Sequence, residues 1–350
     1  MAKKKICFFI GDISGAGGTE RVTKIIAGGL AENYEISILA LYNHCNISID
    51  FADLHVLNAK KGNRSFFKIA KNIRNYVSSR NIDVLINVDS ILMAFSVFAL
   101  IGVTCKNVCW EHFNYKTNAF SNFRPIARRL AKLFGDRIIV LTERDRLYWN
   151  NGKVVVIPNP SPFQFPEVNL NNRKNKIIAV GRYSHQKGLD RLLQIWEIVQ
   201  KKNIDNSFEL DIIGQGELKE NLQKTIDERG IKNVFLSPYT NNVEEVYRES
   251  HIYVMTSHFE GLPMVLIEAL SFGIPIVSFD IDCGPSDIIT NGENGFLIPN
   301  GDLSAFAEKL SFLMCNRNEV LRMSKNCLEK RENYGNKAIM DCWTSFLKEL

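Results

Sequence analysis

The sequence has no cysteines at the close spacing of a CxxC pair. Its eight cysteines are scattered as single residues, without a CxxC pair or a Cys/His cluster at the spacing of metal ligands. This pattern argues against a disulfide framework and offers no cysteine-based metal site. It is typical of thiols that stay reduced, and we therefore expect a cytoplasmic protein.

Long hydrophobic runs are also missing. The most apolar stretch, ILMAFSVFALIGV at residues 91–103, is too short to span a bilayer, and Asp89 stands just before it. We expect a buried helix there. The basic run at residues 3–5 precedes only a short apolar stretch that glycines interrupt, so we expect no signal peptide.

The composition that remains is ordinary for a soluble globular protein. Of the 350 residues, 45% are apolar and 23% are charged, and the length suits two domains. Charge is spread unevenly, because residues 1–160 carry 22 Lys/Arg against 12 Asp/Glu while the remainder carries 21 against 26. The basic first half suggests a polyanionic or membrane-surface partner.

Short apolar runs alternate with longer amphipathic ones along most of the chain. In the first half they predict strands at residues 6–10, 36–41, 84–88, 107–110, 137–141 and 154–157, with helices between them, for instance at 19–33 and 66–77. A proline- and asparagine-rich linker is predicted at 158–175. Beyond it we expect strands at 176–181, 209–213, 234–236, 252–255, 275–279 and 295–298, and helices at 189–202, 217–228, 263–272 and 303–314. This alternation predicts two doubly wound, Rossmann-like α/β domains in tandem, at 1–160 and 161–335, facing a cleft.

A glycine cluster, GAGGTERV at residues 15–22, follows the first predicted strand. It fails the GxGxxG dinucleotide fingerprint because the position three after Gly17 is Glu20, and no GK[ST] of a P-loop follows. What remains is a flexible turn at a helix N-terminus, with Thr19 as a candidate N-cap and backbone amides open to a ligand. The alternative is a tight strand–helix turn without a ligand.

Two further motifs lie in the second half. In VGRYSHQKGLDRLL, Arg182 and Lys187 stand near a helix N-terminus, where cations oppose the helix dipole, so we expect an anion such as a pyrophosphate between them. The alternative is a pair of solvated surface cations. In HFEGLPMVLIEAL, Glu260 follows a strand and Glu268 stands inside an apolar run. A buried carboxylate needs a partner, either a ligand's ribose hydroxyls or an arginine elsewhere in the chain.

Together these motifs resemble the retaining glycosyltransferases of family 4, which have the GT-B fold. Arg182 and Lys187 in a GR…KG segment, Glu260 and Glu268 with seven residues between them, and the glycine loop carry the resemblance over nearly the whole chain. The resemblance implies that Arg182 and Lys187 clamp the diphosphate of a nucleotide-sugar donor. It also implies that Glu268 binds the ribose and that Glu260 faces the transferred sugar.

The resemblance assigns the remaining site residues as well. The expected donor-binding set is Gly17, Gly18, Arg182, Lys187, Glu260, Gly261, Leu262, Pro263, Met264, Val265 and Glu268, and the expected catalytic set is Arg182, Lys187, Glu260 and His112. A DxD at residues 280–282 resembles a metal-binding motif of another glycosyltransferase fold. Because the cationic clamp makes a metal unnecessary, we expect no metal and no cofactor beyond the nucleotide sugar.

The expected activity is retaining transfer of a hexosyl or N-acetylhexosaminyl group, from a UDP-sugar or a GDP-sugar, to a glycan or lipid-linked saccharide in polysaccharide or O-antigen synthesis. A sugar-nucleotide epimerase of the same fold and a non-catalytic sugar-nucleotide-binding protein are the alternatives. In this family the first domain binds the acceptor, and the last helix, here residues 336–350, often crosses back to that domain.

The basic first half has a candidate use at a membrane. Residues 66–77 form an amphipathic pattern, with Phe66, Ile69, Ile73 and Val77 on one face. Basic residues cluster around this pattern and form a second set downstream: Lys60, Lys61, Arg64, Lys68, Lys71, Arg74 and Arg80, then Arg124, Arg128, Arg129 and Lys132. They suggest peripheral binding to the anionic inner face of a membrane, or an ordinary helix with a solvated face. No nucleic-acid-binding motif accompanies the charge.

Overall fold

A computed structural model describes residues 3–15, 17–57, 66–117, 122–171, 173–202, 207–240 and 242–350. The chain folds into two compact units, the first formed by residues 1–162 together with 336–350 and the second by residues 163–335. The sequence-based boundary at 160/161 lies two residues before the observed one.

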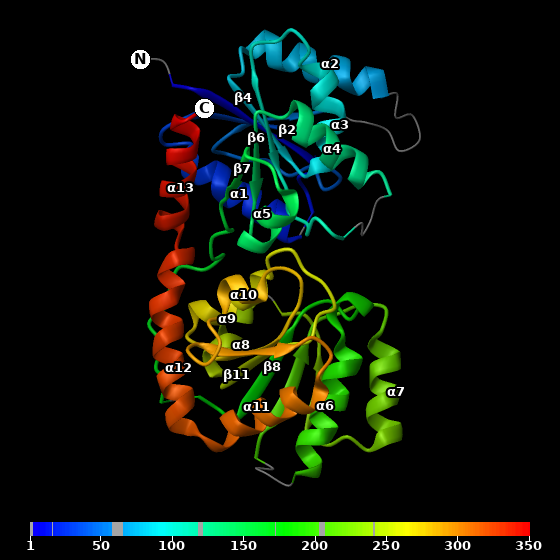
Figure 1. The fold of residues 1–350 in the computed structure, drawn as a ribbon, viewed down its shortest axis with the longest axis vertical. Helices are drawn as coiled ribbons and strands as arrows, with labels where there is room; N and C mark the ends of the chain where they lie inside the picture. The colour runs from blue at the N-terminus through cyan, green and yellow to red at the C-terminus, as the bar shows by residue number, and fades with distance from the viewer. Residues whose placement is uncertain are drawn as a thin grey trace. The chain divides into compact units, whose positions relative to one another are not determined.

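The first unit is built on a seven-stranded parallel sheet in the order β3-β2-β1-β4-β5-β6-β7 (Figure 1). Its strands are β1 (Lys5–Asp12), β2 (Glu35–Tyr42), β3 (Asp53–Val56), β4 (Val84–Val88), β5 (Lys106–Trp110), β6 (Arg137–Val140) and β7 (Val154–Val156). Strand β3 was not predicted, because its side chains alternate between exposed and half-buried at a sheet edge and give no apolar run.

Helices cover both faces of this sheet. Helices α1 (Gly18–Leu30) and α13 (Asn336–Lys348) lie on one face. Helices α2 (Phe66–Arg80), α3 (Ser90–Ala99) and α4 (Arg124–Phe134) form a layer on the other, and α5 (Glu143–Trp149) follows β6. Trp343 of α13 is fully buried in the first unit, with its ring 4.9 Å from Trp110 and 6.2 Å from Phe8. The last helix therefore completes the core of the first unit.

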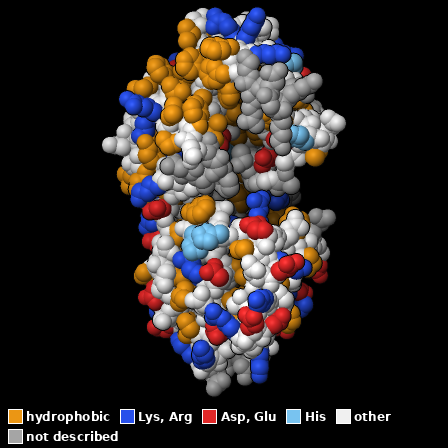
Figure 2. All heavy atoms as spheres, turned by 90° about the vertical axis from the view of Figure 1, so that its right-hand side faces the viewer, with side chains coloured by type: hydrophobic (Ala, Val, Ile, Leu, Met, Phe, Trp, Pro, Cys, Tyr) orange, Lys and Arg blue, Asp and Glu red, His pale blue; other side chains and the backbone are white. Residues whose placement is uncertain are grey.

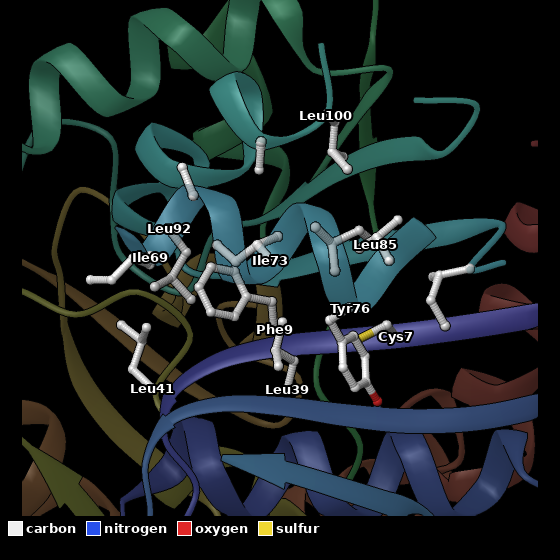
Figure 3. Close-up of a cluster of buried hydrophobic side chains, with 14 residues drawn as sticks. Cys7, Phe9, Leu39, Leu41, Ile69, Ile73, Tyr76, Leu85, Leu92 and Leu100 are labelled. Atoms are coloured by element: carbon white, nitrogen blue, oxygen red, sulfur yellow. The ribbon is translucent and has the colours of Figure 1, made fainter. Parts of the chain in front are cut away.

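The core between the sheet and α2 explains the amphipathic pattern of residues 66–77. Ile69, Ile73 and Val77 are buried against side chains of β1, β2 and β4, including Phe9 and Leu39 (Figure 3). The apolar face of α2 is therefore ordinary core packing, as the alternative of an ordinary helix with a solvated face expects, and peripheral membrane binding stays a prediction. The predicted basic residues Lys60, Lys61 and Arg64 lie outside the described residues.

The second unit has a six-stranded parallel sheet in the order β10-β9-β8-β11-β12-β13. Its strands are β8 (Lys176–Val180), β9 (Glu209–Ile213), β10 (Val234–Ser237), β11 (Ile252–Met255), β12 (Ile276–Asp280) and β13 (Gly295–Pro299). Its α-helices are α6 (Leu189–Lys201), α7 (Lys219–Arg229), α8 (Val243–Glu249), α9 (Met264–Ser271), α10 (Pro285–Ile288), α11 (Leu303–Cys315) and α12 (Arg317–Lys330). The short 3-10 helices are η1 (His185–Lys187) and η2 (Arg331–Tyr334).

The strand order reverses once in each sheet, between β1 and β4 and between β8 and β11. In doubly wound sheets, ligands bind at such switch points, beyond the carboxyl ends of the strands. The predicted fold class is confirmed, and the glycine loop and the GR…KG segment follow β1 and β8 respectively. The described part of the chain contains no helix that is both long and apolar enough to span a membrane.

Candidate functional site

The loop after β8 carries Arg182 and is anchored by the neighbouring Tyr183. The Tyr183 side chain is fully buried, and its hydroxyl lies 2.7 Å from the carbonyl oxygens of both Ile212 and Ser237. The Arg182 side chain is exposed and makes no hydrogen bond or ion pair with any residue that the structure describes. The loop thus presents a rigid backbone and one uncommitted guanidinium at the β8 end of the switch point.

Gly188 brings the next segment against the end of β11. It has the left-handed φ of +58°, and a side chain there would collide with the Thr256 carbonyl oxygen. The segment is then bonded across to residues 256–260: the Gln186 side chain donates to the Phe259 carbonyl at 3.1 Å, and His258 N–H donates to the Gln186 carbonyl at 2.8 Å. A glycine is required here because the two loops touch through their backbones.

This contact places Lys187 against Glu260. Lys187 Nζ lies 2.7 Å from Glu260 Oε1, and Gln186 Nε2 donates to Glu260 Oε2 at 3.2 Å. The Lys187 and Glu260 side chains are only 19% and 10% exposed, so the pair is shielded from water more than a surface salt bridge. The resemblance assigns separate roles to Lys187 and Glu260, and in the structure their side chains form an ion pair.

The N-terminus of α9 stands in the same loop region. Gly261, Leu262 and Pro263 connect Glu260 to the helix, whose N-cap is Pro263 and whose first residues are Met264 and Val265. No side chain caps this end. A helix N-terminus carries partial positive charge and unbonded amides, which favour a phosphate. Lys187 and Val265 both line a hollow of about 10 Å³ at the ends of β8 and β11.

Glu268 lies one turn further along α9 and is half-buried. Its Oε2 accepts a hydrogen bond of 2.7 Å from the hydroxyl of Tyr247, whose ring is fully buried and stacks on Phe272. The carboxylate that the sequence left in need of a partner therefore has a protein donor on one oxygen. Tyr247 comes from α8, 21 residues away along the chain, and no local sequence pattern predicts this contact.

A second loop supports this region from β12. Gly284 has a φ of +100°, and a side chain there would collide with the Pro263 ring and lie 2.7 Å from the Gly261 carbonyl oxygen. The DxD at residues 280–282 sits at the end of β12. Among the described residues, no group of three or more His, Cys, Asp or Glu side chains is arranged to hold a metal ion.

The glycine loop of the first unit differs in detail from its prediction. Helix α1 starts at Gly18 with Gly17 as its N-cap and no side-chain cap, so the assignment of Thr19 as N-cap is wrong. Thr19 instead lies within the helix, where its carbonyl accepts from the Thr23 hydroxyl at 2.8 Å. Glu20, in the first turn, folds back so that a side chain on Gly17 would meet its carboxylate at 2.5 Å. Glu20, which stands where the dinucleotide fingerprint needs a glycine, therefore places its carboxylate against the loop itself.

His112 follows β5 and is buried on the ring of Trp110, with centroids 4.4 Å apart. Its Nε2 has no hydrogen-bond partner in the described structure. Burial, aided by the positive charge of Arg124, lowers the pKa of His112 to about 3. The imidazole is therefore neutral at ordinary pH, and its orphan nitrogen is suited to bind a neutral hydroxyl rather than to act as a cation.

Buried ion pairs hold the loop that carries His112. Arg124 pairs with Asp89 at 2.7 Å and with Glu111 at 3.1 Å, and Arg128 pairs with Glu111 at 3.1 Å. Arg128 also donates to the Asn114 carbonyl at 2.8 Å. Both arginines are almost fully buried, so the predicted basic surface set that included them is corrected to an internal network.

A pocket of about 500 Å³ opens at the β1/β4 switch point of the first unit. Carboxylates of Asp12, Glu20 and Asp89 line it together with the aromatic rings of Tyr42, Phe66, Phe95, Phe113 and Phe123. Aromatic faces and hydrogen-bond acceptors are the groups that bind the two faces and the hydroxyls of a sugar. Sequence reasoning missed this set because its members come from several separate segments between residues 12 and 123.

Three comparisons relate this chain to known proteins. The sequence profile described as "Glycosyl transferases group 1" matches residues 160–331. An uncharacterized glycosyltransferase of Haemophilus influenzae is 34% identical over 98% of this chain and 100% of its own length. A Campylobacter jejuni enzyme named as an N-acetyl-D-galactosaminyltransferase acting on an undecaprenol-PP-linked saccharide is 26% identical over 99% of both chains. The solved structure of Anabaena HepE in complex with UDP superimposes with a TM-score of 0.84 over 99% of this chain and 100% of HepE, at 16% identity, which supports the fold alone.

Proposed function

Because this chain belongs to the group 1 glycosyl transferases, we propose that it moves a hexosyl or N-acetylhexosaminyl group from a UDP-sugar to a saccharide acceptor, with retention of the anomeric configuration. The acceptor is a glycan or a lipid-linked saccharide in the synthesis of a bacterial polysaccharide or O-antigen. The Campylobacter relative named above acts on an undecaprenol-linked saccharide, which supports the choice of acceptor, and HepE, which shares the fold, was solved in complex with UDP.

The observation that carries the proposal is the arrangement at the β8/β11 switch point. The uncommitted Arg182 side chain, the Lys187–Glu260 pair and the N-terminus of α9 all follow β8 or β11, within one unit. Arg182 and Lys187 bind the diphosphate, and the amides at Met264 and Val265 add to the positive field. Glu268 accepts hydrogen bonds from the ribose hydroxyls, oriented by the Tyr247 hydroxyl.

Glu260 has two partners that define its role. Its Oε1 is paired with Lys187 and its Oε2 with Gln186, so the carboxylate is held in one orientation. When a diphosphate engages Lys187, Glu260 becomes available to accept from a hydroxyl of the sugar being transferred. The 185–188 and 256–260 loops therefore position diphosphate and sugar relative to each other.

The acceptor binds the pocket at the β1/β4 switch point of the first unit. Asp12 and Asp89 accept from saccharide hydroxyls, and the aromatic lining covers the apolar faces of the sugar ring. His112, expected near the transferred sugar, does not line this pocket, and its Nε2 is buried. Because saccharide hydroxyls are uncharged, this pocket needs no basic residues to bind them.

In the reaction, the acceptor hydroxyl attacks the anomeric carbon from the face that the diphosphate leaves. The bond from carbon to the diphosphate oxygen breaks, and the acceptor proton passes to that departing oxygen. Negative charge grows on the leaving diphosphate, and Arg182 and Lys187 stabilise it in a site partly shielded from water. These two cations take the place that a metal ion occupies in other transferases.

The test is a screen of purified protein with UDP- and GDP-sugars, first without and then with saccharide acceptors. We expect slow release of UDP from one sugar nucleotide and faster release with acceptor, with rates unchanged in EDTA. Activity that chelator abolishes and manganese or magnesium restores would contradict the metal-independent mechanism. Formation of an epimeric sugar nucleotide without acceptor would overturn the transferase assignment.

A further inference from the structure

Asp12, the last residue of β1, is a carboxylate whose hydrogen bonds are mostly made within the protein. Its Oδ1 accepts from the backbone N–H of Ser14 at 2.9 Å and from the Ser14 hydroxyl at 2.6 Å, and its Oδ2 contacts Nδ1 of His44. Burial raises the pKa of Asp12, but the hydrogen bonds from Ser14 and His44 outweigh it and lower the pKa below its usual value. An ionised carboxyl group has about four lone-pair sites, so these contacts leave about one for a ligand.

The turn that carries His44 is held in one shape. The Asn43 side chain bridges it, because its Oδ1 accepts from the Ile47 N–H at 3.0 Å and its Nδ2 donates to the Ile47 carbonyl at 2.9 Å. The His44 ring stacks on Tyr42, with centroids 5.3 Å apart and planes 22° apart. Tyr42 and Asp12 are paired in register on β2 and β1, and both line the pocket of the first unit. The His44 imidazole is thus fixed from two sides by residues that line this pocket.

This arrangement decides which nitrogen of the His44 ring is free. An ionised Asp12 can only accept, so Nδ1 carries the proton of the neutral imidazole and Nε2 keeps a lone pair. The His44 side chain is 58% exposed, and its Nε2 makes no hydrogen bond or ion pair with a residue that the structure describes. Figure 2 shows His side chains exposed on the surface of the first unit. A hydrogen-bond acceptor of fixed orientation is therefore presented to solvent beside the pocket.

We infer that His44 is a further acceptor-binding residue, whose Nε2 accepts a hydrogen bond from a hydroxyl of the saccharide. A sugar ring that lies against Tyr42 presents several hydroxyls, and Asp12 alone has about one lone-pair site left for them. His44 supplies the next hydrogen-bond acceptor, and its ring extends the aromatic surface of Tyr42. The inference rests on the proposed function, because it takes this pocket for the acceptor site. The attacking hydroxyl is a different one, and it still gives its proton to the departing diphosphate oxygen.

Long-range ¹H–¹⁵N NMR of histidine-labelled protein tests the tautomer without any ligand. At about pH 8, above the range in which histidines are usually protonated, we expect His44 to show a protonated Nδ1 and an unprotonated Nε2. Asp12→Asn should relax this preference, because an amide offers a donor as well as an acceptor. The His44→Asn spectrum assigns the signals. A protonated Nε2 in the wild type would overturn the inference, whatever the transfer assay shows.

Two substitutions then test contact with the saccharide. His44→Asn keeps a donor near the position of Nδ1 and loses Nε2, whereas His44→Gln places an amide oxygen near the position of Nε2. The probes are the methyl α-glycosides of glucose, galactose, N-acetylglucosamine and N-acetylgalactosamine, titrated by ligand-observed NMR without a sugar nucleotide. His44→Asn should weaken binding about three- to tenfold, as expected for the loss of one hydrogen bond, and His44→Gln should retain most of it. In the transfer assay, the acceptor KM should rise by the same factor with a smaller change in kcat.

His55 provides the matched control. It is also an exposed histidine of the first unit that stacks on a tyrosine, Tyr76, at 5.0 Å and 28°, but its ring has no carboxylate partner among the described residues. His55→Asn should bind the glycosides like the wild type, and urea midpoints check that all the variants are folded. Binding by His44→Asn at the wild-type level would show that His44 only holds Asp12, and would overturn the inference alone. A wild type that transfers sugar but binds none of the glycosides would overturn the inference together with the acceptor site.

Discussion

The Lys187→Ala variant should lose stability and turnover for two different reasons. Removal of the Lys187 ammonium leaves the Glu260 carboxylate, which is 10% exposed, with the Gln186 side chain at 3.2 Å as its remaining partner among the described residues. Breaking a fully buried ion pair costs about 3–5 kcal/mol, and because Lys187 is 19% exposed and Gln186 remains, we expect about 2 kcal/mol here. For a unit of this size that corresponds to a fall in Tm of about 4–8 °C.

The loss of turnover has a different origin and magnitude. Lys187 is proposed to stabilise charge that develops on the leaving diphosphate, and removal of one such group typically lowers kcat by about 10²–10³. Adding Glu260→Gln to Lys187→Ala removes the unpaired carboxylate. The double variant should therefore regain most of its Tm but none of its turnover, as measured by thermal unfolding and by UDP release with acceptor.

The Lys176–Asp211 pair at the start of β8 provides the matched control. Its atoms are 2.9 Å apart and its side chains are 24% and 9% exposed, close to the values for Lys187 and Glu260. Lys176→Ala should lower Tm by a comparable amount and leave kcat unchanged. Recovery of turnover in Lys187→Ala/Glu260→Gln would show that Lys187 acts only by neutralising Glu260, and would refute the clamp.

Three further outcomes follow from the structure. Glu268→Gln should raise the donor KM about tenfold or more with a smaller change in kcat, because a charged acceptor for the ribose is lost, and an unchanged KM in initial-rate assays would contradict this role. Burial, then Arg173 and Arg317, lower the pKa of His251 to about 4. Between pH 6.5 and pH 4 the unfolded state therefore binds a proton at His251 that the folded state does not. Through this residue, lowering the pH from 7 to 5 should cost the wild type about 2 kcal/mol of unfolding free energy. In His251→Gln the loss over the same pH range should be smaller by that amount, as measured by urea unfolding. A chain ending at Gly335 lacks all of α13, including Trp343, whose ring is buried on Trp110 and Phe8, so the first unit should lose more than the about 3–5 kcal/mol of a single buried Trp; a stable, fully active truncation would refute this.

The sequence predicted best what local patterns encode. Strands at 84–88, 209–213 and 252–255 coincide with β4, β9 and β11, because continuous apolar runs are the mark of strands buried on both faces. The segments that carry Arg182, Lys187, Glu260 and Glu268 also fall where the alternation places them, at the ends of β8 and β11. Parallel connectivity then brings these ends to one edge, so their proximity follows from the fold class.

The contacts within the site depend on distant residues and could not be read from any single motif. The Lys187–Glu260 pair requires the left-handed turn at Gly188 and the close approach of Thr256. Tyr247 reaches Glu268 from a short helix that was not predicted at all. The acceptor pocket likewise combines Asp12 and Asp89, which are 77 positions apart in the printed sequence.

The orientation of α4 is the clearest example, because the periodicity of its own residues predicts the opposite of the observed orientation. Periodicity would turn Ile126, Leu133 and Phe134 inward, and each such side chain gains about 1.5–3 kcal/mol on full burial. The structure does the reverse because Glu111 is fully buried directly after β5, and breaking its pairs with Arg124 and Arg128 would cost about 3–5 kcal/mol. Arg124 and Arg128 are therefore drawn inside, and the apolar stripe must face out. The exposed apolar side chains are thus a free-energy deficit that folding alone does not recover, and the same ion-pair network that holds the loop carrying His112 is its cause.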